Sequence, residues 1–199
     1  MKFSFVFLFV YLSLTASSQT LVINEVMASN AATIADEDGD YTDWLELYNT
    51  SNATIDLSQY WLTDDKDEQK KWHLPAIQLL PSEHLLVFCS GKDRLSRELH
   101  TNFKISAAGE KVRIYNESGV ELDQIESIAV FTDQSFGSKI DGSTERIIFE
   151  VPTPGFTNGS ESPYFNAVIF SQKGGIYSQS FNLELIGDDT TELFYTLDG

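Results

Sequence analysis

The stretch WLELY, residues 44–48, decides the fold. Its residues alternate, so that Leu45 and Leu47 fall on one face of an extended chain while their neighbours fall on the other. A period of two residues is typical of a strand whose two faces meet different surroundings, whereas a helix repeats about every 3.6 residues. The stretch therefore predicts a β-strand.

Segments of the same kind recur in both directions from this stretch, separated by turn residues at intervals of roughly 8–12 residues. Strands spaced in this way without intervening helices predict an all-β sandwich or barrel. One short helical turn is expected at residues 92–100, where Leu95 and Leu99 are four positions apart. The other predicted strands are residues 21–27, 54–57, 60–63, 71–74, 84–89, 103–105, 112–115, 120–125, 136–140 and 146–149.

The N-terminus has the layout of a secretory signal peptide. Lys2 precedes a nearly unbroken apolar run over residues 3–14, and small residues follow at Ala16 and Ser18. Cleavage is expected before Gln19, so that residues 1–18 leave the mature chain. An N-terminal membrane anchor is the alternative, but the apolar run falls short of the roughly 20 residues that span a bilayer.

The single cysteine, Cys89, excludes an internal disulfide. It ends an apolar segment, residues 84–89, that is predicted to be a buried strand. An activated cysteine needs a partly exposed, electropositive environment, so we expect a structural thiol and not a nucleophile.

The chain is strongly acidic, with 30 Asp and Glu residues against 13 Lys and Arg and a formal net charge of -17. This balance argues against a nucleic-acid or anionic-membrane partner, because phosphate contacts need Lys and Arg. It favours solubility, cation binding or a basic partner. Aromatic residues make up 13% of the chain, which argues against a disordered acidic tail.

Part of the acidity lies in one loop, DEDGDYTD, residues 36–43. Asp36, Asp38 and Asp40 alternate, and with Asp43 they offer the carboxylate oxygens that calcium binds in groups of six to eight, roughly 2.3–2.6 Å away. The glycine falls at the wrong position for an EF-hand. The loop therefore predicts either a calcium site or a solvated acidic loop in which Asp43 caps a turn.

The remaining chemical groups predict no enzyme. Glu25 and Glu46 lie inside strands, where an acid–base pair is conceivable but a structural role is expected. His73, His84 and His100 show no metal-ligand spacing, and we expect all three to be structural. The sequence has no nucleophile elbow and no glycine-rich phosphate loop.

The three tryptophans offer an alternative reading as a carbohydrate platform. Trp44, Trp61 and Trp72 all fall at strand positions, however, and in a small sandwich this favours the core.

Several motifs in register resemble bacterial lamin tail domains. They include LVINEVMASN at residues 21–30, DEDGDYTDWLELYN at residues 36–49, WLTDD at residues 61–65 and TPGFTN at residues 153–158. The resemblance covers residues 20–158 and implies an immunoglobulin-like β-sandwich, made by a bacterium.

A shorter resemblance follows a predicted linker at residues 159–163. Residues 164–199, with GGIY at 174–177 and YTLDG at 195–199, resemble the first half of a chitobiase-type C-terminal β-sandwich module. In many bacterial proteins these two modules precede a kinase domain of the spore-coat-protein-H type. No residues of such a domain are present in this sequence.

These observations favour a secreted or cell-surface, non-catalytic module for adhesion or tethering. Its expected partner is an extracellular protein or glycan, with no nucleic acid and no transmembrane anchor. The alternative is an accessory N-terminal region of a larger exported enzyme, a kinase or a hydrolase.

Overall fold

The computed structural model describes residues 20–159, 169–170, 179–182 and 184–186. The predicted signal peptide and most of the chitobiase-like segment fall outside them. The described residues are all-β apart from one short 3-10 helix, η1 (Leu57–Gln59). The strands are β1 (Leu21–Met27), β2 (Trp44–Asn49), β3 (Ile55–Asp56), β4 (Tyr60–Thr63), β5 (Trp72–His73), β6 (Gln78–Leu79), β7 (His84–Phe88), β8 (Leu99–His100), β9 (Lys111–Asn116), β10 (Glu121–Glu126), β11 (Ser135–Ser138), β12 (Arg146–Phe149), β13 (Ile169–Phe170) and β14 (Leu185–Ile186).

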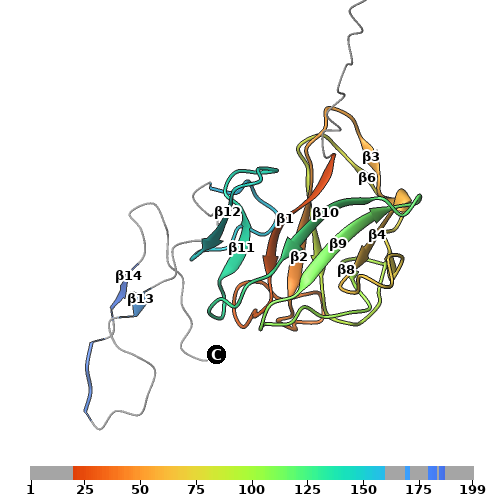
Figure 1. The fold of residues 1–199 in the computed structure, drawn as a ribbon. Coiled ribbons are helices and arrows are strands. Elements are labelled where there is room, and N and C mark those ends of the chain that lie inside the picture. Colours follow the sequence, from red (N-terminus) through yellow and green to blue (C-terminus); the bar gives the residue numbers. More distant parts are fainter. Residues whose placement is uncertain (1–19, 160–168, 171–178, 183, 187–199) are drawn as a thin grey trace, which may run out of the picture.

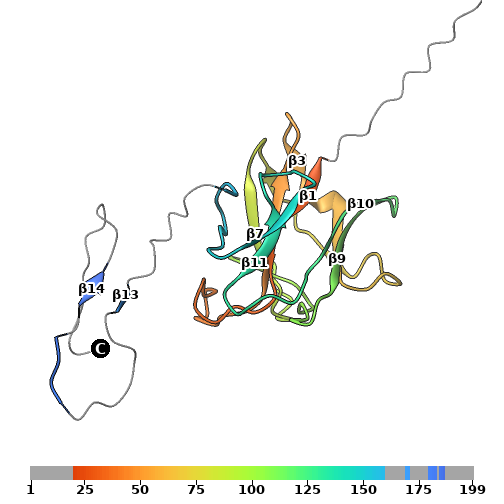
Figure 2. The same ribbon diagram turned by 60° about the vertical axis from the view of Figure 1, so that its left-hand side comes forward.

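Two sheets face each other in an immunoglobulin-like sandwich (Figures 1 and 2), as the sequence predicts. A six-stranded sheet has the order β12-β11-β1-β2-β7-β8, and a four-stranded sheet has the order β10-β9-β4-β5. All neighbours pair antiparallel except β7 and β8, which are parallel. Two shorter pairs, β3 with β6 and β13 with β14, complete the described strands.

The core lies between the two sheets and follows the alternation of the strands. Leu45 and Leu47 of β2 point into it and are fully buried. Ile114 of β9 and Leu62 of β4 meet them from the other sheet. Burial of side chains of this size stabilises a fold by roughly 1.5–3 kcal/mol each, which makes this layer the main source of stability.

The outer face of the six-stranded sheet is buried as well, which explains why every residue of β1 is inaccessible. A second apolar cluster of Met27, Trp44 and Phe88 lies on this face, with Ile34 packed against it from the loop that joins β1 to β2. A β-bulge after Ile23 shifts the register of β1, so that Glu25 lies opposite Glu46. Both carboxylates therefore lie on the outer face.

The predicted helical turn at residues 92–100 is wrong. Asp93 and Arg97 have φ angles of 51° and 62°, which are outside the right-handed helical region. The segment ends instead in β8, whose Leu99 and His100 pair with Val87 and Phe88 of β7. Residues 103–105 do not form the expected strand either, since Lys104 makes only an isolated bridge to Ser90.

Candidate functional site

The acidic loop folds back on Asp36. The Oδ1 atom of this residue accepts hydrogen bonds from the backbone N–H groups of Asp38 and Asp40, each at 3.0 Å. Gly39 allows the turn, because its φ of +84° favours a residue without a Cβ atom. These bonds bring the carboxylates of Asp36, Asp38 and Asp40 together, with one oxygen of each within 4.8 Å of the others.

A lysine lies among these three carboxylates. The Nζ atom of Lys92 is 2.6 Å from Asp36, 2.8 Å from Asp38 and 2.9 Å from Asp40. Burial opposes ionisation of Asp36, but Lys92 and the backbone donors lower its pKa below the ordinary value. The sequence prediction did not include Lys92, which lies 56 positions from Asp36 and 54 positions from Asp38.

A second cation, Arg94, pairs with the neighbouring carboxylates. Its guanidinium contacts Glu37 and lies 2.7 Å from Asp38. Hydrogen bonds from Arg94 and then Lys92 lower the pKa of Asp38. The loop is thus closed by two basic residues of the segment between β7 and β8.

Asp43, the fourth predicted ligand, is not part of this group. Its Oδ2 atom accepts a hydrogen bond from the backbone N–H of Ile105 at 3.2 Å. Burial raises the pKa of Asp43 to about 6. The carboxylate holds the segment after β8 against the start of β2.

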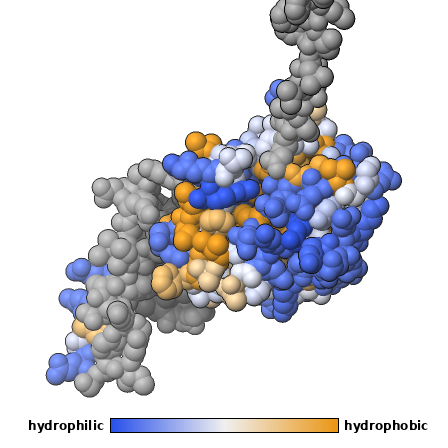
Figure 3. Space-filling view, viewed as in Figure 1, coloured by the Kyte–Doolittle hydropathy of each residue, from blue (hydrophilic) through white to orange (hydrophobic). Residues whose placement is uncertain are grey.

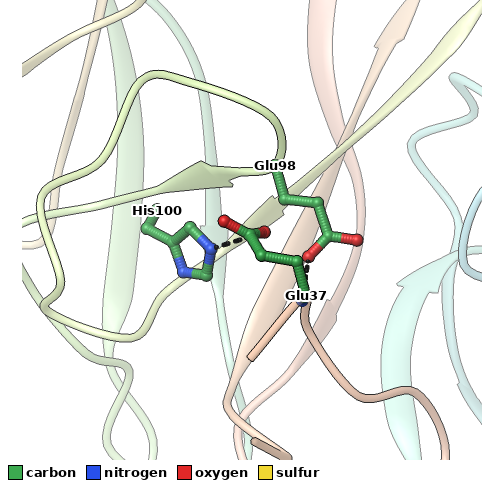
Figure 4. A group of neighbouring side chains, drawn as sticks. All are labelled: Glu37, Glu98 and His100. Atoms are coloured by element: carbon green, nitrogen blue, oxygen red, sulfur yellow. Dashed lines mark hydrogen bonds and ion pairs between the residues drawn. The ribbon is translucent and has the colours of Figure 1, made fainter. Parts of the chain in front are cut away.

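A group of Glu37, Glu98 and His100 lies beside the loop (Figure 4). His100 is fully buried, with Nε2 3.2 Å from Glu37 and Nδ1 2.9 Å from the Ser90 hydroxyl. The hydrogen bond with Glu98, and those from Arg94 and His100, lower the pKa of Glu37 to about 2. Burial and the hydrogen bond with Glu37 raise the pKa of Glu98 above its ordinary value.

This group has donor atoms of the kind that zinc binds, namely one imidazole nitrogen and two carboxylates. The residues are 61 and 63 positions apart in the sequence, as the separations of Glu37 from Glu98 and from His100 show. The short parallel strand β8 carries His100, directly follows Glu98, and places both beside Glu37. Histidine spacing therefore could not reveal the group.

The two strand glutamates, Glu25 and Glu46, are fully buried on the outer face of the six-stranded sheet. Glu25 accepts hydrogen bonds from the Ser135 hydroxyl, from the Thr153 hydroxyl at 2.7 Å and from the Thr153 N–H at 3.1 Å. Glu46 accepts from the Asn24 amide at 3.0 Å and from the Gly155 N–H. All four carboxylate oxygens therefore have donors from the domain itself.

Burial strongly affects the ionisation of this pair. It raises the pKa of Glu46 to about 7, and it raises the pKa of Glu25 despite the hydrogen bonds from Ser135 and Thr153. His84 lies 3.3 Å from Asp141 at the rim of the pair. Burial lowers the pKa of His84, but Asp141 and Glu46 raise it above the ordinary value overall.

The segment TPGFTN, residues 153–158, holds these groups in place. Besides the contacts of Thr153 and Gly155, the Asn158 amide donates to the Ser138 carbonyl at 2.6 Å. The Asn158 N–H donates to Asp141 at 2.8 Å. The segment thus covers the outer face of the sheet and links β11 to the two glutamates.

Cys89 and two of the tryptophans lie in the core, as predicted. Cys89 is fully buried, and burial raises the pKa of its thiol well above the ordinary value. Trp44 and Trp72 are buried. Trp61 is only half-buried, and it stacks on His73 with the ring centroids 4.5 Å apart.

A model of the Lamin Tail Domain family matches residues 15–129, more than half of the chain. The chain belongs to the lamin tail domain family. Membership indicates a binding or structural module with an immunoglobulin-like fold, in a family that is generally non-catalytic. No curated protein matches the chain. Among the residues that the structure describes, no helix has the length and hydropathy needed to cross a membrane.

The match to the lamin tail family ends before β11, although β11 and the TPGFTN segment contribute donors to Glu25 and Glu46. The resemblance of residues 164–199 to a chitobiase-type module stays a prediction, as does the link to a kinase of the spore-coat-protein-H type.

Proposed function

We propose that this lamin tail protein is a secreted, non-catalytic binding module that tethers an extracellular or envelope partner, a protein or a glycan. The family supports a binding or structural role. The layout of residues 1–18 supports export. The strong net negative charge of -17 disfavours nucleic acid as the partner.

The observation that carries this proposal is the saturation of the buried acid pair. Glu25 and Glu46 have the elevated pKa values expected of general acids, but all their oxygens accept hydrogen bonds from Asn24, Ser135, Thr153 or Gly155. A general acid or base must be within hydrogen-bond reach of its substrate. The pair instead holds the TPGFTN segment on the sheet.

A second group of catalytic type is also used for packing. Ser90, His100 and Glu37 form a hydrogen-bonded chain like that of a nucleophile with its base and orienting acid. Ser90 is buried, however, and its Oγ atom also accepts the Lys92 N–H at 3.2 Å. These hydrogen bonds therefore link the acidic loop to β8.

The test is a direct search for a partner with the purified full chain. Surface pull-downs from the producing cells and a glycan array should give saturable binding, which bovine serum albumin at the same concentration does not show. Binding of neither proteins nor glycans would overturn the proposal. Mass spectrometry of the exported chain should find Gln19 at its N-terminus. Retention of residues 1–18 would contradict the proposal that a signal peptide directs export.

The alternative is an accessory region of a larger exported enzyme, a kinase or a hydrolase. It is supported by the resemblance of residues 164–199 to part of a chitobiase-type module, and the described β13–β14 pair is compatible with such a β module. Reading the coding sequence beyond the codon for Gly199 decides this alternative. An enzyme domain in frame would support it, and a stop codon would remove it.

Calcium binding by Asp36, Asp38 and Asp40 is a further part of the proposal. It requires the Lys92 ammonium to leave the three carboxylates, because its distances of 2.6–2.9 Å leave no room for an ion between them. Lys92 and calcium therefore compete for the same oxygens. Asp43 is not included, since it binds the Ile105 N–H.

A further inference from the structure

The two sheets of the sandwich have unequal widths. The six-stranded sheet ends in β11 and β12, while the four-stranded sheet ends in β10, which packs against β1. Figure 1 shows β11 and β12 extending beyond β10 on the side where the larger sheet has no facing strand. We call the inner face of β11 and β12 the overhang.

The overhang is apolar at Phe136 and Ile148, while Ser138 and Arg146 lie on the same face. Phe136 of β11 and Ile148 of β12 lie opposite each other in the strand ladder, and the Ile148 side chain is 45% exposed. Phe131, in the loop before β11, is 80% exposed. Figure 3 shows apolar side chains gathered on this face beside β11 and β12. Soluble proteins commonly use such exposed apolar patches for binding.

A groove of about 370 Å³ runs between the overhang and the edge of β10. Its walls come from both sheets, and apolar side chains line it together with polar and charged ones. The lining residues are Lys111, Gln124, Ile125, Glu126, Ile128, Phe136 and Arg146.

Among the residues that the structure describes, no strand pairs with the edge of β10 that borders this groove. The Ser127 N–H donates to the Glu110 carbonyl, which places the next bonded pair of the ladder at Ile125 and Val112. Because bonded and non-bonded pairs alternate in an antiparallel ladder, Gln124 and Glu126 direct their N–H and C=O groups toward the groove. A free edge of this kind is a template for one more strand.

We propose that an extended peptide segment with alternating apolar and basic residues binds in this groove as an added strand beside β10. This inference rests on the proposed binding function and specifies its surface and partner. A strand occupies about 4.7–4.9 Å of sheet width, and the overhang is two strands wide. The apolar residues of the peptide cover Phe136 and Ile148, and its basic residues lie on the solvent face near Glu126.

The choice of a basic partner follows from charge. The chain carries a net charge of -17, so its field attracts a cationic segment and repels a second copy of the chain. Glu121 and Glu126 are exposed on β10, where they pair with Arg113 at 3.6 Å and with Lys111 at 3.3 Å, and exposed ion pairs of this kind are weak enough for a basic side chain of the peptide to replace. Backbone pairing supplies affinity in such strand additions, while alternate side chains supply specificity.

The experiment uses the full chain and a fluorescent ten-residue peptide of alternating Lys and Val, followed by anisotropy. The controls are a peptide of the same composition with its Lys and Val in two blocks and an alternating Glu–Val peptide. The alternating Lys–Val peptide should bind at least ten times more tightly than either control. Equal binding of the blocked peptide would overturn the added strand and leave only charge attraction.

Two variants of the chain locate the binding site. Ile148→Gln removes apolar cover, and Gln124→Pro removes an N–H from the free edge without removing a bond to β9. Each should weaken peptide binding at least tenfold, whereas Leu80→Gln, an exposed apolar site in the turn between β6 and β7, should not. Unchanged binding by both variants would overturn the proposal.

Hydrogen exchange identifies the occupant. The amides of Gln124 and Glu126 should exchange rapidly in the free chain and slowly with the Lys–Val peptide. If these amides exchange slowly in a monomer without peptide, another segment of the same chain fills the groove. If the wild-type chain forms a dimer that Ile148→Gln does not form, a second copy fills the groove. Either result overturns the proposal.

The proposed function can fail separately. If the wild-type chain captures a surface partner that both variants capture equally well, the groove proposal falls and the function stands. If the chain captures no surface partner but the peptide binds and the variants abolish that binding, the function falls and the groove remains a peptide site.

Discussion

At the residue scale, Lys92 allows an unusually acidic loop to fold. Asp36 is buried, with carboxylate oxygens of Asp38 and Asp40 within 4.8 Å of its own, and buried carboxylates without a partner are strongly destabilising. The ammonium contacts all three carboxylates and supplies their shared counter-charge. The same residue also makes calcium binding conditional, because both cations need the same oxygens.

Lys92→Met should therefore destabilise the domain and expose its calcium affinity. We expect the melting temperature to fall by roughly 3–8 °C, since about 1 kcal/mol corresponds to roughly 2–4 °C in a chain of this length. Millimolar calcium should then raise the melting temperature of Lys92→Met more than that of the wild type. Differential scanning calorimetry with and without calcium measures both effects.

The matched control is Lys66→Met, which removes an exposed lysine near other aspartates without touching the loop. It should change neither the melting temperature nor the calcium response. If calcium leaves both Lys92→Met and the wild type unaffected, Asp36, Asp38 and Asp40 do not form a calcium site.

Glu46 should make the domain more stable in mild acid than in mild base. Its pKa is about 7 in the native state and about 4.5 in the unfolded chain, so between these values the native state binds more protons. Stability therefore falls as the pH rises through this window, by up to about 3 kcal/mol from this group. The raised pKa values of Glu25, Asp43 and His84 act in the same direction.

Glu46→Gln should flatten this pH dependence in urea unfolding measured between pH 5 and 8. At pH 5 the variant should be less stable by about 1 kcal/mol, because an amide nitrogen replaces one of the acceptors for Asn24 and Gly155. Glu117→Gln, at an exposed position, should keep the wild-type slope. A slope in Glu46→Gln as steep as that of the wild type would contradict the role of Glu46.

At the element scale, the close approach of β11 to β1 depends on one glycine. A Cβ atom at Gly137 would lie 2.4 Å from the Asn24 carbonyl oxygen and 2.8 Å from the Glu25 Cα atom. Both are backbone atoms at the bulge of β1, which cannot move without disturbing the Glu25–Glu46 register. The position therefore tolerates no side chain.

Gly137→Ala should destabilise the domain by more than about 2 kcal/mol, in the range found for overpacked cores. Gly39→Ala is the comparison, because Gly39 has a positive φ but open space around it. That substitution should cost only about 1 kcal/mol of backbone strain. Guanidinium unfolding of the two variants tests the difference, and equal losses would argue against steric exclusion at Gly137.

Strands with a clear period can be predicted from the sequence, while two of the two-residue strands are missed, although β3 and β5 lie inside the predicted strands 54–57 and 71–74. β1, β2, β4 and β12 are confirmed at or within one residue of the predicted ends. β6 and β8 have two residues each, too few to show a period. The spacing of Leu95 and Leu99 resembled a helical turn, but Leu95 is exposed and Leu99 belongs to β8.

The candidate site shows the same limit. The alternation of Asp36, Asp38 and Asp40 is local and could be predicted. Their contact with Lys92 depends on loops more than fifty residues apart, and that of His100 with Glu37 depends on a parallel strand pair. Neither contact is indicated by a pattern in the sequence. The burial of Glu25 and Glu46 likewise depends on a segment more than a hundred residues away.

At the scale of the whole molecule, the packed unit extends past the residues that the family model matches. The family match ends at Ala129, but β1 lies inside the sheet only because β11 pairs with it. Without the later segments β1 would be an edge strand with the apolar sequence LVINEVM, and long apolar edges promote aggregation.

A chain of residues 20–129 should therefore fail to fold cooperatively, whereas a chain of residues 20–159 should melt like the full protein. The shorter chain lacks the donors from Ser135, Thr153 and Gly155, and it exposes the free edge of β1 to other copies. Near-ultraviolet circular dichroism and size-exclusion chromatography separate the outcomes, because aggregation and a lost tertiary signal should appear together. A soluble, cooperatively melting chain of residues 20–129 would mean that the sandwich folds without β11, β12 and TPGFTN. In that case the groove between β10 and the overhang would be an addition to a complete domain and not a part of its fold.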